Sequence, residues 1–527
     1  MTNFLPITDA NSATPSNRFI SNILYQPLFS YQHKSPTKYN LDTLRSLAEV
    51  TNISEDGLTY TIALRNRSWS DGTPITTNDI ELWWRLIVTN KEKWWGYHAG
   101  KMPDTITSFT IDDPKTFRIT TDKVYNPQWF VGNELAHIIP LPQHIWDPNN
   151  TAETPAGAEQ LYTDLVAAAP DARNKFLNVV SGPFKIDNHQ GDGTITLTAV
   201  EKYDGLDRPK LTTLKLQPTP EADISKNLLD NKLDVATLPI TTPADQIKAI
   251  QDKGFTVTPQ YDWGISYLSF NFNNKNSLPL LGQLYLRKAL QRLINQDNLI
   301  KNSWSNNARA GCDPLPVAPN AAPKPCAAPT SYDLQAVKQE LTSHGWQQRG
   351  NESICIDPAK CGEGITAGTK LQLIVITTTG NAAIPELNQL RDEFKQAGVT
   401  LTINQVPDAV AVMSDCLKTG RQCEWDLGLT AAPSSWVFPT YPSGEHIFSS
   451  TGVANFGGFS NAQADELIEE TYQSTTPDSL VAYSNFINER QPVLWLPQPA
   501  ARYVVHPKNM TGVDPALPII PQNWSTE

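Results

Sequence analysis

The segment of residues 371–429 carries the pattern that most restricts the fold of this chain. Alternating apolar residues over 371–375 and 399–403 predict two strands, and the apolar spacing over 387–398 predicts a helix between them that ends at a glycine. A third strand is expected over 425–429. Because strands joined through a helix pair in parallel, the pattern predicts an α/β fold built on a parallel sheet.

Two loops follow the predicted strands at their carboxyl ends, over residues 377–381 and 431–438. Ligands of such sheets bind beyond the carboxyl ends of the strands. The second loop contains Trp436 and Phe438 next to two serines, and aromatic walls with a few polar donors suit a peptide or a sugar. We therefore expect this loop to line a binding site.

A separate helix is predicted over residues 77–87, where Ile80, Trp83, Trp84 and Ile87 recur at helical spacing. The two indoles are expected in the core rather than against a ligand. With 527 residues, the chain is longer than one hydrophobic core serves. Two or three structural units are therefore expected.

The charge balance argues against a nucleic-acid partner, because the net charge is −12 and no Lys/Arg-rich run occurs. No apolar stretch approaches the roughly 18 residues that cross a bilayer. The first residues from Met1 lack the basic start and apolar core of a secretion signal. Either the protein is cytoplasmic, or this is the mature chain of an exported protein with an added initiator Met.

The cysteines favour export. The six cysteines fall into three close pairs, Cys312 with Cys326, Cys355 with Cys361, and Cys416 with Cys423. Pairing within each close pair is the simplest arrangement of the 15 that six cysteines allow. A metal site is the alternative, but no CxxC motif and no nearby His cluster supports it. We expect three disulfides and an oxidising compartment.

Short motifs in a fixed order run through nearly the whole chain and resemble those of the family 5 extracellular solute-binding proteins, the dipeptide- and oligopeptide-binding receptors of ABC importers. The most specific of them is similar to Trp69-Ser-Asp-Gly-Thr-Pro74 with its flanking segments. The matching segments are residues 25–29, 56–65, 69–74, 77–80, 181–185, 201–205, 233–235, 267–271, 286–290, 332–346 and 459–467. Residues 125–130 and 140–144 look most like the branch from actinobacteria and related Gram-positives.

The resemblance implies a two-lobed α/β fold like that of type II periplasmic binding proteins, in the large variety of the peptide receptors, with a hinge between the lobes. Lobe one would comprise residues 1–265, with a subdomain at roughly 45–180, completed by 485–527. Lobe two would comprise residues 266–484. Ligand would be enclosed by hinge closure, which requires only that it contacts both lobes.

The implied function is capture of a small-molecule or peptide ligand outside the cytoplasm and delivery to the membrane permease of an ABC importer. The chain would be a monomer without cofactor or catalytic activity, lipid-anchored at the surface of a Gram-positive cell. Energy would come from a partner subunit, because no Gly-rich phosphate loop occurs.

The resemblance also points to binding residues. Receptors of this family commonly hold the amino terminus of a peptide with an aspartate, but the matching loop here, residues 431–439, contains no Asp or Glu. Asp426 lies within the predicted strand, where a structural role is at least as well supported. The residues predicted to bind ligand are Trp436, Phe438, Ser434, Ser435, Trp263, Tyr25 and Asn271.

Other functions were weighed against this one. No GxSxG or HExxH motif occurs, and the segment 443–446, which contains Ser, Glu and His, is interpreted as a polar loop rather than a catalytic triad. An oligosaccharide or a metal chelate remains an alternative ligand. A surface adhesion protein without a transport role is the alternative from another class.

Overall fold

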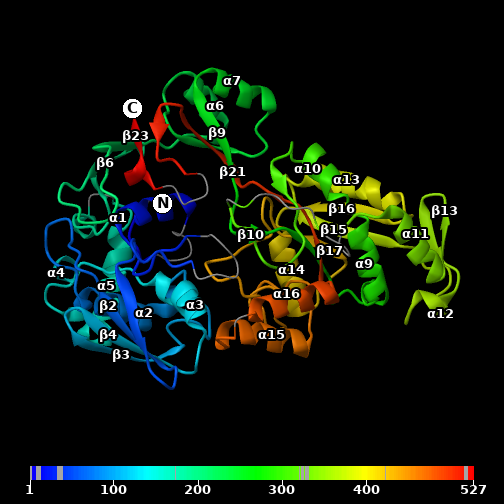
Figure 1. The fold of residues 1–527 in the computed structure, drawn as a ribbon, viewed down its shortest axis with the longest axis horizontal. Helices are drawn as coiled ribbons and strands as arrows, with labels where there is room; N and C mark the ends of the chain where they lie inside the picture. Colours follow the sequence, from blue (N-terminus) through cyan, green and yellow to red (C-terminus); the bar gives the residue numbers. More distant parts are fainter. Residues whose placement is uncertain are drawn as a thin grey trace.

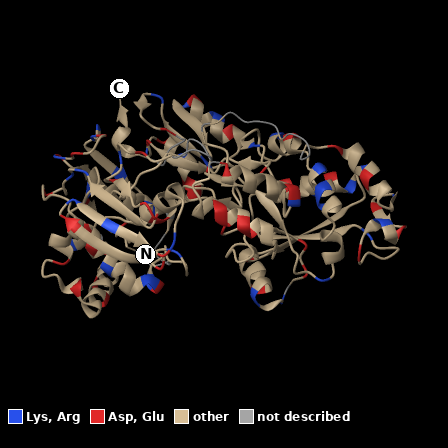
Figure 2. Cartoon of the chain, turned by 60° about the horizontal axis from the view of Figure 1, so that its bottom comes forward, with Lys and Arg blue, Asp and Glu red and all other residues tan. Residues whose placement is uncertain are grey.

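The computed structural model describes residues 3–7, 14–32, 40–171, 174–319, 321, 326, 331–421, 423–476, 478–514 and 520–526. These residues form two lobes, each with its own sheets and core. Figure 1 shows lobe one in blue to green with the red C-terminal strands, and lobe two in green to orange beside it. Lys and Arg are interspersed with Asp and Glu over both lobes (Figure 2).

Lobe one begins with a subdomain built on an antiparallel sheet of order β1-β2-β4-β3. Its elements are α1 (Pro15–Leu24), β1 (Ala48–Ile53), β2 (Thr59–Leu64), α2 (Thr77–Asn90), β3 (Ile106–Asp113), β4 (Thr116–Thr121), α3 (Pro127–Trp129), α4 (Gln143–Trp146) and α5 (Pro155–Ala168). Helix α2 begins with a capping box of Thr76 and Asp79, and it buries Ile80 and Trp83 as predicted. Trp84 is half-buried and stacks on Phe109, with ring centroids 5.7 Å apart.

Two three-stranded antiparallel sheets complete lobe one, of orders β5-β6-β7 and β8-β21-β9. Their elements are β5 (Phe184–His189), β6 (Ile195–Ala199), β7 (Thr213–Leu216), α6 (Glu221–Leu229), β8 (Ala236–Pro239), α7 (Ala244–Asp252), β9 (Phe255–Gln260) and β21 (Arg502–Pro507). Short strands β22 (Met510–Thr511) and β23 (Ser525–Thr526) pair near the C-terminus. The C-terminal strand β21 therefore lies between two strands from the middle of the chain.

Lobe two is organised around a five-stranded sheet of order β16-β15-β17-β11-β19. Strands β15 (Gln372–Thr378), β16 (Thr400–Val406) and β17 (Leu427–Leu429) run parallel, with α13 (Ile384–Lys395) and α14 (Ala409–Thr419) as the crossovers. This confirms the predicted strand–helix–strand unit. Gly398 ends the first crossover with a left-handed φ of 73°, which favours glycine.

Other elements of lobe two surround this sheet. Strands β11 (Tyr267–Phe270) and β19 (Val493–Trp495) add antiparallel to its edge. The remaining elements are α8 (Leu278–Leu281), α9 (Leu284–Arg292), α10 (Gln296–Asn302), β12 (Ala308–Arg309), α11 (Leu334–Ser343), β13 (Trp346–Arg349), β14 (Glu352–Cys355), α12 (Pro358–Cys361), α15 (Ala462–Gln473) and α16 (Ser479–Arg490). Asn461, rather than the expected Ser460, caps α15, so this helix begins one residue later than the sequence suggests.

The chain crosses between the lobes at two neighbouring segments. The first lies between β9 and β10 (Gly264–Ile265), and the second lies after β20 (Gln498–Pro499). The amide of Ala501 donates to the carbonyl of Gln260 at 2.7 Å, so the two segments are hydrogen-bonded to each other. The expected boundary at residue 485 is wrong, because β19 is part of the lobe-two sheet and the chain returns only after it.

All three predicted disulfides form: Cys312–Cys326, Cys355–Cys361 and Cys416–Cys423. Each closes a local loop of lobe two. Among the described residues, no helix combines the length and apolar character needed to cross a bilayer.

Candidate functional site

The lobes contact each other through a segment of lobe one that ends in a π-helical turn, Phe130–Glu134. The side-chain amide of Asn133 donates to the carbonyl of Tyr441 at 2.9 Å, and its carbonyl accepts from the amides of Thr440 and Tyr441 at 3.1 and 2.8 Å. One side chain of lobe one therefore holds two successive peptide groups of lobe two.

A second contact lies beside the first. The backbone amide of Asn126 donates to the carbonyl of Tyr472 at 2.8 Å, and its side chain donates to the carbonyl of Thr471 at 3.1 Å. Tyr441 and Tyr472 pack against the cores of both lobes. The loop 440–446 and the end of α15 therefore form the lobe-two side of a shared interface.

The charged centre of this interface is Glu445. Its side chain is 9% exposed, and its Oε1 accepts from the indole N–H of Trp129 at 3.0 Å and lies 3.9 Å from the ammonium of Lys101. Burial raises the pKa of the Glu445 carboxyl, but Lys101 and His446 lower it, and the balance holds this pKa below its ordinary value. Glu445 is thus a buried carboxylate.

The ammonium of Lys101 lies between aromatic rings. It is 4.5 Å from the ring centroid of Trp129 and 5.1 Å from that of Tyr472, both within the range of cation–π attraction. Trp129 and Lys101 belong to lobe one, whereas Tyr472 and Glu445 belong to lobe two. The four side chains form a box for one cation, and we call them the Lys101 box.

Glu134 is a second buried acid near this box. Its Oε2 accepts from the backbone amide of Met102 at 2.8 Å. Burial raises the pKa of Glu134 to about 7, with Glu445 adding to the rise and Lys101 and the Met102 hydrogen bond opposing it. Near neutral pH, Glu134 therefore carries a partial charge and leaves Glu445 as the main anion.

Three aromatic rings bridge the lobes on the more exposed side. The ring of His98, from lobe one, lies 5.9 Å from that of His446, which in turn lies 5.7 Å from that of Trp436. Burial lowers the pKa of His446, so its ring is neutral at neutral pH. His98 is exposed and Trp436 is half-buried, which leaves these faces available to a ligand.

Several polar atoms at this interface have no hydrogen-bond partner among the described residues. They are Oε2 of Glu445, Oγ of Ser443, Oγ of Ser434 and the hydroxyl of Tyr483. Tyr483 lies against the same loop, because a Cβ at Gly444 would be 2.4 Å from its hydroxyl oxygen. Buried polar groups normally have partners, so this loop has capacity for further donors and acceptors.

The predicted loop residues have different roles in the structure. Trp436 lies in β18 (Trp436–Val437), which pairs with β10, and the exposed Val437 follows it. The hydroxyl of Ser435 accepts from the amide of Tyr267 and donates to its carbonyl, both at 3.0 Å, and so fixes the loop onto β11. Only Trp436 presents a large partly exposed surface near the lobe interface.

Phe438 and Trp263 are buried in the lobe-two core, 3% and 4% exposed. The Trp263 indole donates to the carbonyl of Thr440 at 3.2 Å, so it supports the loop that Asn133 holds. Ser434 is buried with its hydroxyl beside Gly264. These residues position the site from beneath.

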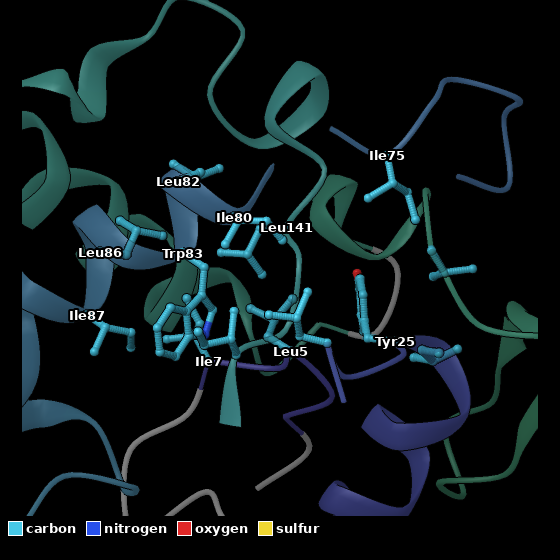
Figure 3. Close-up of a cluster of buried hydrophobic side chains, with 14 of the residues drawn as sticks. Leu5, Ile7, Tyr25, Ile75, Ile80, Leu82, Trp83, Leu86, Ile87 and Leu141 are labelled. Atoms are coloured by element: carbon cyan, nitrogen blue, oxygen red, sulfur yellow. The ribbon is translucent and has the colours of Figure 1, made fainter. Parts of the chain in front are cut away.

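Two predicted residues do not belong to the site. Tyr25 is fully buried in the lobe-one core, where its hydroxyl donates to the carbonyl of Phe176 at 2.8 Å (Figure 3). Asn271 is also fully buried, and its amide donates to the carbonyl of Trp425 at 2.8 Å. Both satisfy polar groups inside a lobe, so the expectation that they line a cleft is wrong.

The loop after β15 is not exposed as its position suggests. Thr377 is fully buried, and its hydroxyl accepts from the Asn381 amide at 3.1 Å within a local turn. A small apolar cavity of about 20 Å³ lies elsewhere in lobe two, between α9, α11 and the sheet, with Leu290 and Val337 in its lining. It has room for about one water and no polar partner for it, so it is a packing void.

The functional residues missed by the sequence reasoning are Lys101, Trp129, Glu445 and His446. The segment containing Glu445 was interpreted as a polar loop, although it follows the aromatic loop directly. Its acidic residue was the available signal. Its partner Trp129 lies 316 residues away in sequence, and no local pattern connects the two.

Comparison with known families and structures agrees with this architecture. The family described as bacterial extracellular solute-binding proteins, family 5 (middle region), matches residues 45–455. A protein of Brucella ovis, named as a peptide-binding protein of an ABC transporter, is 27% identical over 341 residues, which cover 63% of this chain. The alignment spans only 57% of that relative's length.

Two solved structures share the fold over nearly their full length. The oligopeptide-binding protein AppA of Bacillus subtilis, in complex with a nonapeptide, is 19% identical with a TM-score of 0.64, covering 100% of this chain and 98% of AppA. The periplasmic EDTA-binding protein EppA is 18% identical with a TM-score of 0.71, covering 100% of this chain and 94% of EppA. The family is one of binding proteins rather than enzymes. Since its match covers well over half of the sequence, the chain belongs to the family 5 bacterial extracellular solute-binding proteins.

Proposed function

We propose that this protein is the substrate-binding component of an ABC importer and that it captures a peptide-like solute between its two lobes. The observation that carries the proposal is the shared site at the lobe interface, where Lys101 and Trp129 of lobe one meet Glu445 of lobe two. A solute that contacts both sides there favours the closed arrangement of the lobes. No bond of the solute needs to change.

The binding surface we propose is formed by the half-buried ring of Trp436, the exposed side chains of Val437 and His98, and the ring of His446. The unpartnered atoms of Ser443 and Glu445 lie in the same loop and supply polar contacts. Such a combination of apolar faces with a few polar groups is typical of small-molecule sites. The names of the Brucella relative and of AppA favour a peptide.

The remaining features of this function follow from the family. The protein would act outside the cytoplasm as a monomer, deliver its ligand to a membrane permease, and be held at a Gram-positive surface by a lipid anchor. Motifs at 125–130 and 140–144 favour the actinobacterial branch. The three disulfides support an oxidising compartment.

A metal chelate is the second candidate ligand. The observation in its favour is the pair of imidazoles, His98 and His446, that face each other across the lobes at 5.9 Å. Among the described residues, no group of three or more His, Cys, Asp or Glu is arranged to hold a bare metal ion. A chelate would bring its own ligands, and EppA, of the same fold, is named for binding EDTA.

Thermal stability in the presence of candidate solutes tests the function. Pools of tripeptides to pentapeptides, oligosaccharides and metal–EDTA or metal–histidine chelates are added separately to the purified chain. A bound solute at 100 times its dissociation constant stabilises a protein by about 2.7 kcal/mol. We expect the peptide pool to raise the melting temperature. A shift with none of the pools would contradict the receptor function and favour the adhesion alternative.

A further inference from the structure

The buried carboxylate of Glu445 must be neutralised by a nearby cation. A charge held out of water is strongly destabilised unless it is paired and hydrogen-bonded. Glu445 has one strong hydrogen bond, from the Trp129 indole at 3.0 Å. An indole N–H carries no net charge, so the compensating charge has to come from another group.

Lys101 supplies this charge from within the chain. Its ammonium lies 3.9 Å from Oε1 of Glu445, and its side chain is 21% exposed. The distance is too long for a direct hydrogen bond, so the pairing is electrostatic. The faces of Trp129 and Tyr472 hold the ammonium in place at 4.5 and 5.1 Å.

The other titratable groups around the box do not change this balance. Glu134 is shared between its charged and neutral forms near pH 7, and burial keeps His446 neutral. His98 approaches from lobe one at the exposed edge. The box therefore contains one full negative charge and one full positive charge before any solute enters.

A second ammonium entering this box would meet Lys101 as a like charge, with a single carboxylate to share. An uncharged donor, such as an amide N–H or a hydroxyl, meets no such repulsion, and Oε2 of Glu445 has no partner among the described residues. A neutral end group is therefore favoured at this position over a charged amine.

We propose that Lys101 is an internal counter-ion that occupies the place of a ligand's amino terminus, so that this receptor selects solutes with an uncharged end group, such as N-acylated peptides. This inference rests on the proposed function and specifies the solute class for the same site. It accounts for the absence of an acidic residue from the loop 431–439, because the site acid has its own cation.

The experiment compares two pools of the same tripeptides to pentapeptides, one with free amino termini and one N-acetylated. Retention of each peptide by the protein is measured by equilibrium dialysis and mass spectrometry. The wild-type chain is expected to retain the acetylated pool more strongly. Lys101→Met, which keeps the side-chain length but removes the charge, is expected to shift the ratio about tenfold towards free amines, equivalent to one charge-assisted contact.

Lys123→Met is the matched control. Lys123 is another lobe-one lysine 3.9 Å from a lobe-two carboxylate, that of Glu469, but this pair is about half exposed. Its removal should leave the ratio as in the wild-type chain. If Lys101→Met fails to fold because Glu445 is left uncompensated, the double variant Lys101→Met/Glu445→Gln has no charge at the box and should bind both pools without a tenfold preference.

Each outcome decides the proposal. Retention of only the free pool by the wild-type chain, or an unchanged ratio in Lys101→Met, would overturn the counter-ion role and leave the receptor function intact. A tenfold preference in the double variant would overturn it as well. Retention of neither pool by any variant would instead overturn the proposed function and the inference together.

Discussion

The amide group of Asn133 in lobe one binds the backbone of Tyr441 in lobe two at both ends, donating to its carbonyl at 2.9 Å and accepting from its N–H at 2.8 Å. A side chain that satisfies both groups of one peptide unit fixes its position and its orientation. The loop bearing Glu445 is therefore held to lobe one by a contact that does not involve charge.

Loss of this contact should loosen the lobes. Asn133→Ala leaves three hydrogen-bonding groups of the interface without a partner, and a buried unsatisfied group costs about 1–3 kcal/mol. We expect a lower melting temperature and a larger radius of gyration by small-angle scattering. Asn188→Ala, at an exposed position of β5, is the control and should change neither. An unchanged radius would show that Asn133 does not restrain the lobes.

Trp436 and Phe438 should separate binding from stability. Trp436→Ala removes a half-buried ring from the proposed ligand surface and should weaken solute binding while the melting temperature of the empty protein changes little. Phe438→Ala empties a core position that is 3% exposed and should cost about 3–5 kcal/mol of stability. Calorimetry with a retained solute and thermal unfolding distinguish the two. Unaltered affinity in Trp436→Ala would remove that residue from the site.

Glu386 should make the stability depend on pH. This carboxyl is 2% exposed in α13, and burial raises its pKa to about 8. The folded state keeps the proton between the unfolded pKa of about 4.5 and 8, where the unfolded state has lost it. Stability therefore falls as pH rises through this window, by about 1.4 kcal/mol for each unit of pKa difference.

Glu386→Gln removes the titration and should flatten this part of the pH profile, measured by urea unfolding from pH 5 to pH 8. Glu466→Gln, at an exposed position of α15, should leave the wild-type slope. A slope that persists unchanged in Glu386→Gln would assign the dependence to other groups, among which Glu134 is the first candidate because its pKa is raised to about 7.

The disulfides give a chemical prediction. Thiol titration of the denatured, unreduced protein should find no free thiols among the six cysteines, which all pair in the structure. Replacing Cys312 and Cys326 together by serine opens a loop of 14 residues and should cost about 3 kcal/mol. Detection of six reactive thiols would overturn the assignment to an oxidising compartment.

Much of the fold could be predicted because its signals are local. The alternation over 371–375 and the helical spacing over 387–398 each depend on a few neighbouring residues, and the structure confirms both. The cysteine pairs are equally local. The boundary at 485 was wrong because α16 and β19 have no sequence feature that shows which sheet they join.

The site could be predicted only in part, because exposure in the folded state is set by distant segments. Trp436 and Phe438 are two residues apart and both aromatic, yet one is half-buried at the interface and the other lies in the core. The pairing of Glu445 with Trp129 joins positions 316 residues apart. A sequence without aligned homologues contains no signal for such a contact.

The pairing of β18 with β10 couples recognition to movement. Gly264 and Ile265, directly after the first crossing segment, are in register with Val437 and Trp436, and a Cβ at Gly264 would lie 2.5 Å from the Trp436 carbonyl oxygen. Any twist of the crossing segment therefore displaces the indole on which a solute would rest. Grip on the cargo and the angle between the halves become a single mechanical variable, so substitutions along this short ribbon can retune affinity without touching the cargo itself.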